Sequence, residues 1–80
     1  MAAISTLRTV LTVAETVFGT RVDADDNFFS VGGDSVSAVE LIARLHEAFD
    51  REIDPEVILE SDTFAEMAES LHALRMNESA

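Results

Sequence analysis

The chain has 80 residues, enough for one small domain, and 48% of them are hydrophobic, with five Phe and no Trp or Tyr. Its formal net charge of −11 comes from 16 acidic residues and five arginines. This charge argues against nucleic acid or an anionic membrane as partner and favours basic proteins. The absence of cysteine excludes disulfides and thiolate chemistry by the chain itself. No stretch matches a signal peptide or a membrane span, so we expect a cytoplasmic protein.

The first predicted element is an amphipathic helix that Gly19 is placed to end. The apolar residues with helical spacing are Ile4, Leu7, Val10, Leu11, Ala14, Val17 and Phe18. Residues 20–34 then form a loop without sustained periodicity, and a long loop in so small a domain usually has a function. The apolar residues expected to hold this loop against the core are Val22, Phe28, Phe29 and Val31.

A second helix is predicted from about Ser35 to Phe49, with Asp34 or Ser35 as its N-cap. Its core-facing stripe is expected to consist of Ala38, Leu41, Ile42, Leu45 and Phe49. Val36 lies opposite this stripe and Val39 lies on its flank. Neither valine is therefore needed for the core.

Two more helices follow. Asp54 is a capping acid before Pro55, which suits the first position of a helix. This third helix must be short, because a new turn begins near residue 61. Thr63 and Glu66 have the spacing of a capping box at the start of the last helix. The apolar face of that helix is expected to consist of Phe64, Met67, Ala68, Leu71 and Leu74.

These elements predict an all-α fold, with three main helices and one short third helix. No alternating strand pattern and no internal repeat are present in the sequence. We expect a single domain over residues 1–80, with a helical core at about 4–74 and a tail at 75–80.

The most informative segment is residues 28–35, Phe-Phe-Ser-Val-Gly-Gly-Asp-Ser. Two aromatic residues anchor a loop, and a serine hydroxyl follows the glycine pair at the start of a helix. Ordinary helix capping by Asp34 or Ser35 would account for the last four residues alone. Together with the order of the helices, however, the segment resembles the attachment site of phosphopantetheine-dependent carrier proteins. The closest type is the peptidyl carrier domain of nonribosomal peptide synthetases, and the resemblance covers about residues 4–74.

The resemblance implies that Ser35 receives 4′-phosphopantetheine from coenzyme A through a phosphopantetheinyl transferase. It further implies that the protein tethers an aminoacyl or related acyl group as a thioester and is not itself an enzyme. Gly32 and Gly33 would leave room for the arm and for a partner's active site, and the helix start would favour the phosphate charge. Asp34 would act during the metal-dependent transfer, cap the helix, or do both.

The resemblance implies two kinds of partner, an adenylating or acyl-loading enzyme and downstream condensation or tailoring enzymes. We expect the carrier itself to be a monomer. Val36 and Val39 are the best candidates for partner contact, and Ile58 is a weaker one. Val36 departs from the peptidyl type, in which leucine is usual after the serine, and Glu40 followed by Leu41 resembles acyl carriers. A polyketide-type or aryl acyl carrier protein is therefore the alternative. The initial Met and the end soon after the last helix suggest a free-standing carrier, although an excised domain would look the same.

Other interpretations are weaker. An acidic helical adaptor without a cofactor would use Ser35 only as a helix cap. Residues 23–27 begin like a calcium loop, but Phe28 stands where the loop needs glycine. A serine hydrolase needs a base near its nucleophile, and His46 is about 16 Å from Ser35 along the helix. Two histidines without cysteine disfavour structural zinc, so we expect no metal site and place His46 and His72 on the surface or at helix ends.

Overall fold

A computed structural model describes the backbone of residues 2–79 and the side chains of residues 5–73. Its helices are α1 (Ala2–Phe18), α2 (Ser35–Phe49), α3 (Pro55–Glu60) and α4 (Phe64–Ser79). No strand occurs among the described residues, and the all-α prediction is confirmed. No helix in this part of the chain is both long and apolar enough to cross a membrane.

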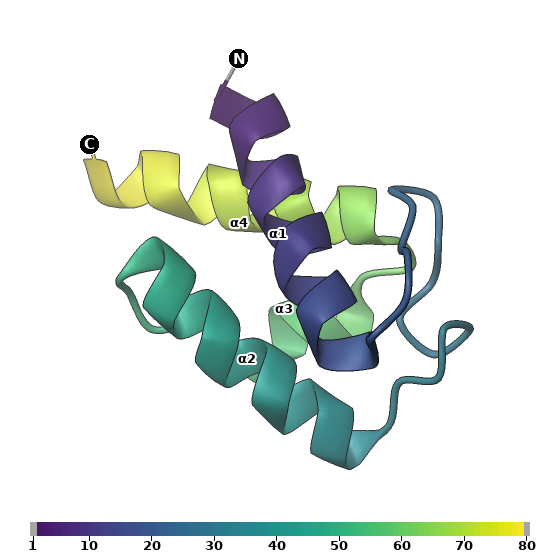
Figure 1. The fold of residues 1–80 in the computed structure, drawn as a ribbon. Coiled ribbons are helices and arrows are strands. Elements are labelled where there is room, and N and C mark those ends of the chain that lie inside the picture. Colours follow the sequence, from purple (N-terminus) through teal and green to yellow (C-terminus); the bar gives the residue numbers. More distant parts are fainter. Residues whose placement is uncertain (1, 80) are drawn as a thin grey trace.

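The helices enclose one core. α1 packs against α2 and α4, and the short α3 packs against α2 and α4 (Figure 1). The start of α1 and the end of α4 lie on one side of the molecule, and the long loop between α1 and α2 lies on the other. The first residue of α2 is therefore held at the end of this loop, away from the chain ends.

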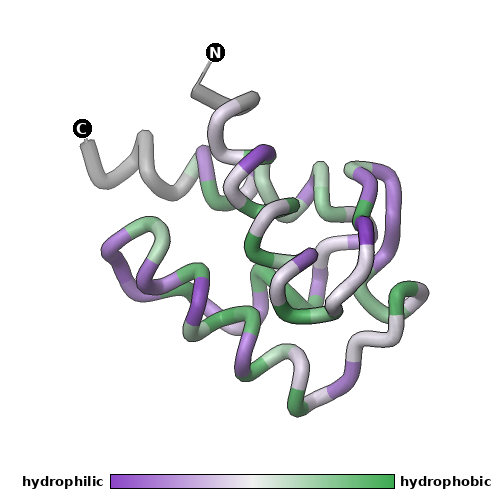
Figure 2. The backbone as a smooth tube through the Cα atoms, viewed as in Figure 1, coloured by the Kyte–Doolittle hydropathy of each residue, from purple (hydrophilic) through white to green (hydrophobic). Residues whose placement is uncertain are grey.

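The predicted apolar faces form this core. The buried hydrophobic residues are Val10, Ala14, Val22, Phe28, Ala38, Leu41, Leu45, Ile53, Ile58, Phe64, Met67, Ala68 and Leu71. Ile42 and Phe49 of the predicted α2 stripe are partly buried against them. Hydrophobic and hydrophilic residues alternate along α2 as expected for a helix with one buried face (Figure 2). The side chains of Ile4 and Leu74, also expected in the core, lie outside the described ones.

The helix ends follow most of the predicted signals. Gly19 ends α1 with a φ of +69°, and its N–H donates to the carbonyl of Glu15 at 2.8 Å. Asp54 caps α3, with Pro55 in the first turn. α4 continues to Ser79, although we expected a tail from residue 75. The reason is local, because residues 75–79 contain neither glycine nor proline to end the helix.

The capping box before α4 forms in a modified way. The hydroxyl of Thr63 accepts the N–H of Glu66 at 3.1 Å, as predicted. The carboxylate of Glu66 accepts the N–H of Asp62 at 3.2 Å, one residue earlier than the usual partner. The side chains of the box therefore hold the residues just before α4 as well as its first turn.

The long loop is held at both ends. The N–H of Val22 donates to the Glu15 carboxylate at 3.1 Å, and Val22 itself is buried. Phe28 is buried as predicted, with 1% of its surface exposed. Phe29 was also expected to anchor the loop, but 55% of its surface is exposed. Adjacent loop residues point in different directions, so only one ring of the pair enters the core.

Candidate functional site

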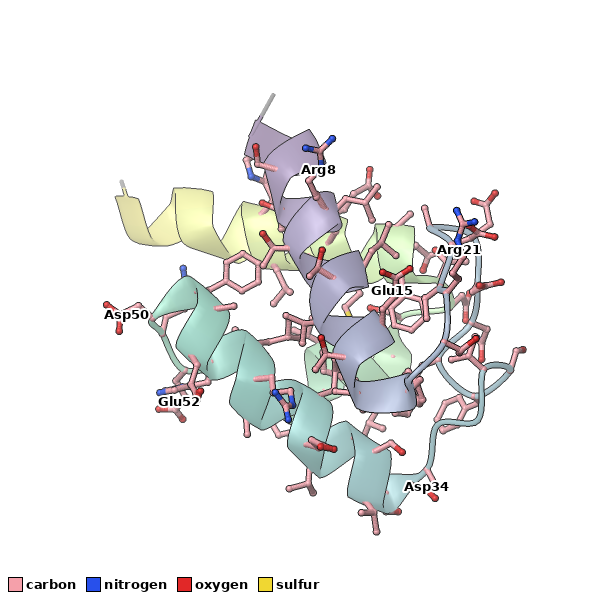
Figure 3. All side chains as sticks on the ribbon, viewed as in Figure 1. Arg8, Glu15, Arg21, Asp34, Asp50 and Glu52 are labelled. Atoms are coloured by element: carbon pink, nitrogen blue, oxygen red, sulfur yellow. The ribbon has the colours of Figure 1, made fainter. Side chains whose placement is uncertain are left out.

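Ser35 is the first residue of α2, and the helix is capped by its neighbour. Asp34 has an extended backbone, and its carboxylate accepts the N–H of Ser37 at 2.9 Å. Figure 3 shows Asp34 where the loop meets α2. Ser35 is exposed, and its hydroxyl has no hydrogen-bond partner among the described residues. Since Asp34 performs the capping, the hydroxyl of Ser35 is available for another role.

The electrostatics at this helix start are set by Asp34. The N–H and the side chain of Ser37 lower the pKa of the Asp34 carboxyl, with a further contribution from the N–H of Val36 and despite opposition from desolvation. The carboxylate is therefore charged at neutral pH and directed to the helix amides. This arrangement confirms the capping role considered for Asp34 and leaves a role in modification as a prediction.

The two glycines before Asp34 serve different structural needs. Gly32 has a φ of +102°, which other residues rarely adopt, but a Cβ there would meet nothing within 4 Å. A Cβ on Gly33 would lie 2.5 Å from two ring carbons and from the carbonyl oxygen of Phe28. The N–H of Gly33 also donates to that carbonyl at 3.0 Å. The absence of a side chain at Gly33 is thus required by packing within the chain, a reason that the sequence did not reveal.

Phe28 connects this turn to the core. Its ring meets Phe18 of α1 edge-on, with centroids 5.5 Å apart. It also meets the exposed ring of Phe29, with centroids 5.3 Å apart. The turn at Gly33 therefore rests on a buried aromatic ring, which fixes the position from which Ser35 is presented.

Apolar side chains are exposed around this site and on α3. The exposed large hydrophobic residues are Phe29, Val36, Val39 and Leu59. Val36 and Val39 are 78% and 68% exposed, as expected from the α2 pattern. Sequence reasoning missed Phe29 and Leu59. The adjacent aromatic pair was the available signal for Phe29, because two successive side chains rarely face one core.

The expectation that Ile58 contacts partners is wrong for this conformation. Its side chain is fully buried, with 0% of its surface exposed. α3 has six residues, of which Ile58 is fully buried and Val57 is partly buried against the core. Because successive helical residues are rotated by about 100°, the next residue, Leu59, points outward and is 50% exposed. Leu59 replaces Ile58 as the apolar contact candidate on α3.

The remaining polar groups of residues 5–73 define no second site. Arg44 and Glu40 form an exposed i,i+4 ion pair at 3.7 Å, which contributes little stability. His46 is exposed in the last turn of α2, as expected. His72 is only partly exposed and has a buried Nδ1 without a partner in the described structure, so its placement on the surface was wrong in part. No cluster of metal-ligating side chains is found among the described residues.

Known proteins are similar to this chain in sequence and in fold. The profile of the family described as "Phosphopantetheine attachment site" matches residues 8–71. One of the subunits of linear gramicidin synthase from Brevibacillus parabrevis is 41% identical over 58 residues, which are 72% of this chain and 1% of that protein. Surfactin synthase subunit 2 of Bacillus subtilis is 35% identical over 54 residues, 68% of this chain and 2% of that protein. The chain thus spans a very small part of these relatives.

A solved structure agrees over nearly the whole chain. It is that of BlmI, a type-II acyl carrier protein from Streptomyces verticillus involved in bleomycin biosynthesis. The two structures superpose with a TM-score of 0.85 at 27% sequence identity, covering 90% of this chain and 88% of BlmI.

Proposed function

This chain belongs to the phosphopantetheine attachment site family, whose members are carrier domains with covalently attached 4′-phosphopantetheine, and we propose that Ser35 is its attachment residue. The observation that carries the proposal is the exposed hydroxyl of Ser35, which makes no hydrogen bond among the described residues. Asp34 supplies the helix cap in its place. The adaptor alternative needed Ser35 as a cap and therefore loses its main support.

The residues around Ser35 fit the group. Ser35 supplies an oxygen for a phosphodiester in the first turn of α2, where the positive end of the helix dipole favours negative charge. Gly32 is exposed and brings no side chain to the approach. When attached, the group supplies a flexible arm with a terminal thiol that holds an acyl group as a thioester. The chain itself supplies the attachment oxygen, the charge environment and the recognition surface.

The partners we propose are a phosphopantetheinyl transferase, an adenylating or acyl-loading enzyme, and downstream condensation or tailoring enzymes. Support comes from the similarity to synthase subunits and from the exposed apolar residues, Val36 and Val39 on α2 and Leu59 on α3. The net charge of −11 favours partners with basic surfaces. We propose that the carrier acts as a cytoplasmic monomer and leaves the bond chemistry to its partner enzymes, which is the role of carrier domains in this family.

An aminoacyl group is the cargo that the relatives favour, because the two synthase subunits resemble the chain at 35–41% identity. A polyketide-type or aryl acyl group is the second candidate, because Val36 departs from the peptidyl type and Glu40 with Leu41 resembles acyl carriers. The two cargoes are separated by the enzyme that loads the modified protein. Loading by an adenylating enzyme supports the first, and loading by a malonyl transferase supports the second.

The site is tested by intact-mass measurement after incubation with coenzyme A, magnesium and a broad-specificity phosphopantetheinyl transferase. We expect wild type to gain one phosphopantetheinyl unit and Ser35→Ala to gain none while remaining folded. Ser30→Ala is the matched control, because Ser30 is also exposed and lies in the loop that leads to Ser35. Modification of Ser35→Ala, or no modification of folded wild type, would refute the proposed attachment at Ser35.

A further inference from the structure

The side chain of Asn27 joins two segments that are far apart in the sequence. Its Oδ1 accepts the N–H of Phe29 at 2.8 Å and that of Ser30 at 3.3 Å, which closes a local turn. Its Nδ2 donates to the carbonyl of Asp62 at 2.6 Å, across 35 positions of sequence. One amide group therefore shapes the loop before Ser35 and ties it to the junction between α3 and α4.

Two backbone hydrogen bonds reinforce this tie. The carbonyl of Asp26 accepts the N–H of Phe64 at 3.1 Å, and the carbonyl of Ala24 accepts the N–H of Ala65 at 2.9 Å. The first N–H groups of a helix have no partner within it, so the loop satisfies two of these groups in α4. We refer to these two bonds, together with the bond from Asn27 to Asp62, as the loop clamp.

We propose that Asn27 is a positioning residue that fixes the loop relative to α3, so that a phosphopantetheinyl transferase meets both as one surface. The exposed ring on the loop is Phe29, and the exposed apolar side chain on α3 is Leu59. The loop clamp ties the loop that carries Phe29 to the α3–α4 junction, next to the helix that carries Leu59, and so restricts how the two side chains move relative to each other. This inference rests on the proposed attachment at Ser35.

The chemistry of the amide explains why an asparagine is needed. A single short side chain must accept two N–H groups and donate to a carbonyl. An amide does both, whereas a carboxylate only accepts. Asn27→Asp thus keeps the turn but places a carboxylate oxygen against the carbonyl of Asp62. Asn27→Ser also keeps an acceptor for the turn, without added charge, but is too short to reach that carbonyl.

The expected effect is on binding of the carrier rather than on the transfer step. Phe28 packs against Phe18 and Asp34 caps α2, and both contacts lie outside the clamp. We therefore expect the reacting hydroxyl of Ser35 to keep its local geometry when the clamp opens. The loop, however, must be ordered again each time the transferase binds. Loss of one hydrogen bond then raises KM for the carrier about fivefold, with kcat unchanged.

The test measures kcat and KM of phosphopantetheinyl transfer for wild type, Asn27→Asp and Asn27→Ser, with coenzyme A saturating. Thr20→Asp is the control, because it adds the same charge at an exposed loop position outside the clamp. Amide hydrogen exchange at Phe64 and Ala65 gives a second readout that does not depend on the transferase. We expect both Asn27 variants to raise KM and both exchange rates about fivefold, and Thr20→Asp to change neither.

Several results would overturn the proposal. One is faster exchange at Phe64 and Ala65 with an unchanged KM, because the clamp would then exist without positioning the site. Others are a fall in kcat alone and an equal rise in KM for Thr20→Asp. If Asn27→Asp fails to fold, Asn27→Ser decides the question. If wild type is not modified at all, the attachment proposal fails instead, and exchange still reports whether Asn27 holds the clamp.

Discussion

Substitution of Gly33 by alanine tests how the attachment turn is supported. The added Cβ would lie 2.5 Å from the ring and from the carbonyl oxygen of Phe28, whereas ordinary contact begins at 3.4 Å. The ring would have to retreat by about 0.9 Å, but it is buried against Phe18 and has little room to move. The carbonyl would also have to move, and it accepts the N–H of Gly33.

The expected fall in the free energy of unfolding of Gly33→Ala follows from these two effects. Overpacking of a core costs about 1–3 kcal/mol, and loss of the hydrogen bond from Gly33 to Phe28 costs about 1 kcal/mol. Together they lower the free energy of unfolding by about 2–4 kcal/mol, out of a total of about 5–10 kcal/mol for a domain of this size. The midpoint of thermal unfolding should then fall by about 10–25 °C, measured by far-UV circular dichroism.

Gly32→Ala is the matched comparison for this experiment. Its Cβ would meet no atom within 4 Å, so its only cost is that of a φ of +102°. That conformational cost is about 1–2 kcal/mol, smaller than the cost at Gly33. Equal stability of the Gly33→Ala and Gly32→Ala variants would refute the argument that the turn packs directly on Phe28.

Two further predictions concern the cap of α2 and the buried face of α3. Because hydrogen bonds lower the pKa of Asp34 from 3.8, the stability that its charge contributes is present above that value and is lost as pH falls through the lower folded pKa. The stability of wild type relative to Asp34→Asn should therefore shrink in urea titrations carried out below about pH 4, and a constant difference would contradict this linkage. Ile58→Ala should lower the free energy of unfolding by about 2–5 kcal/mol, because Ile58 is fully buried. Leu59→Ala should change it by less than about 0.5 kcal/mol, and equal losses in chemical denaturation would show that the two faces of α3 are assigned wrongly.

The main helices were predictable because their signals are local. The spacing of Ala38, Leu41 and Leu45 alone identifies the buried face of α2, and all three are buried. Gly19 and Pro55 mark helix ends through properties of the single residue. The short α3 was different. With six residues, it is too short for periodicity to show which of Ile58 and Leu59 faces the core.

The motif of the site was predictable from the sequence, but the contacts that hold it in place were not. Both Asp34 and Ser35 are good N-cap residues, and only the observed bond from Ser37 assigns the cap to Asp34. The close approach of Gly33 to Phe28 depends on the path of the turn between them. The hydrogen bond from Asn27 to Asp62 spans 35 positions, and no local sequence pattern predicts such a contact.

The loop clamp also has a consequence for protein engineering. Recognition loops are natural units to graft from one carrier into another when new partners are wanted. Here the carbonyls of Ala24 and Asp26 accept hydrogen bonds from the first two N–H groups of α4, so the start of that helix depends on the loop. A graft of residues 20–34 alone would bring acceptors matched to a helix left behind in the donor. Exchange of residues 62–65 together with the loop should give chimeras that retain a properly started α4.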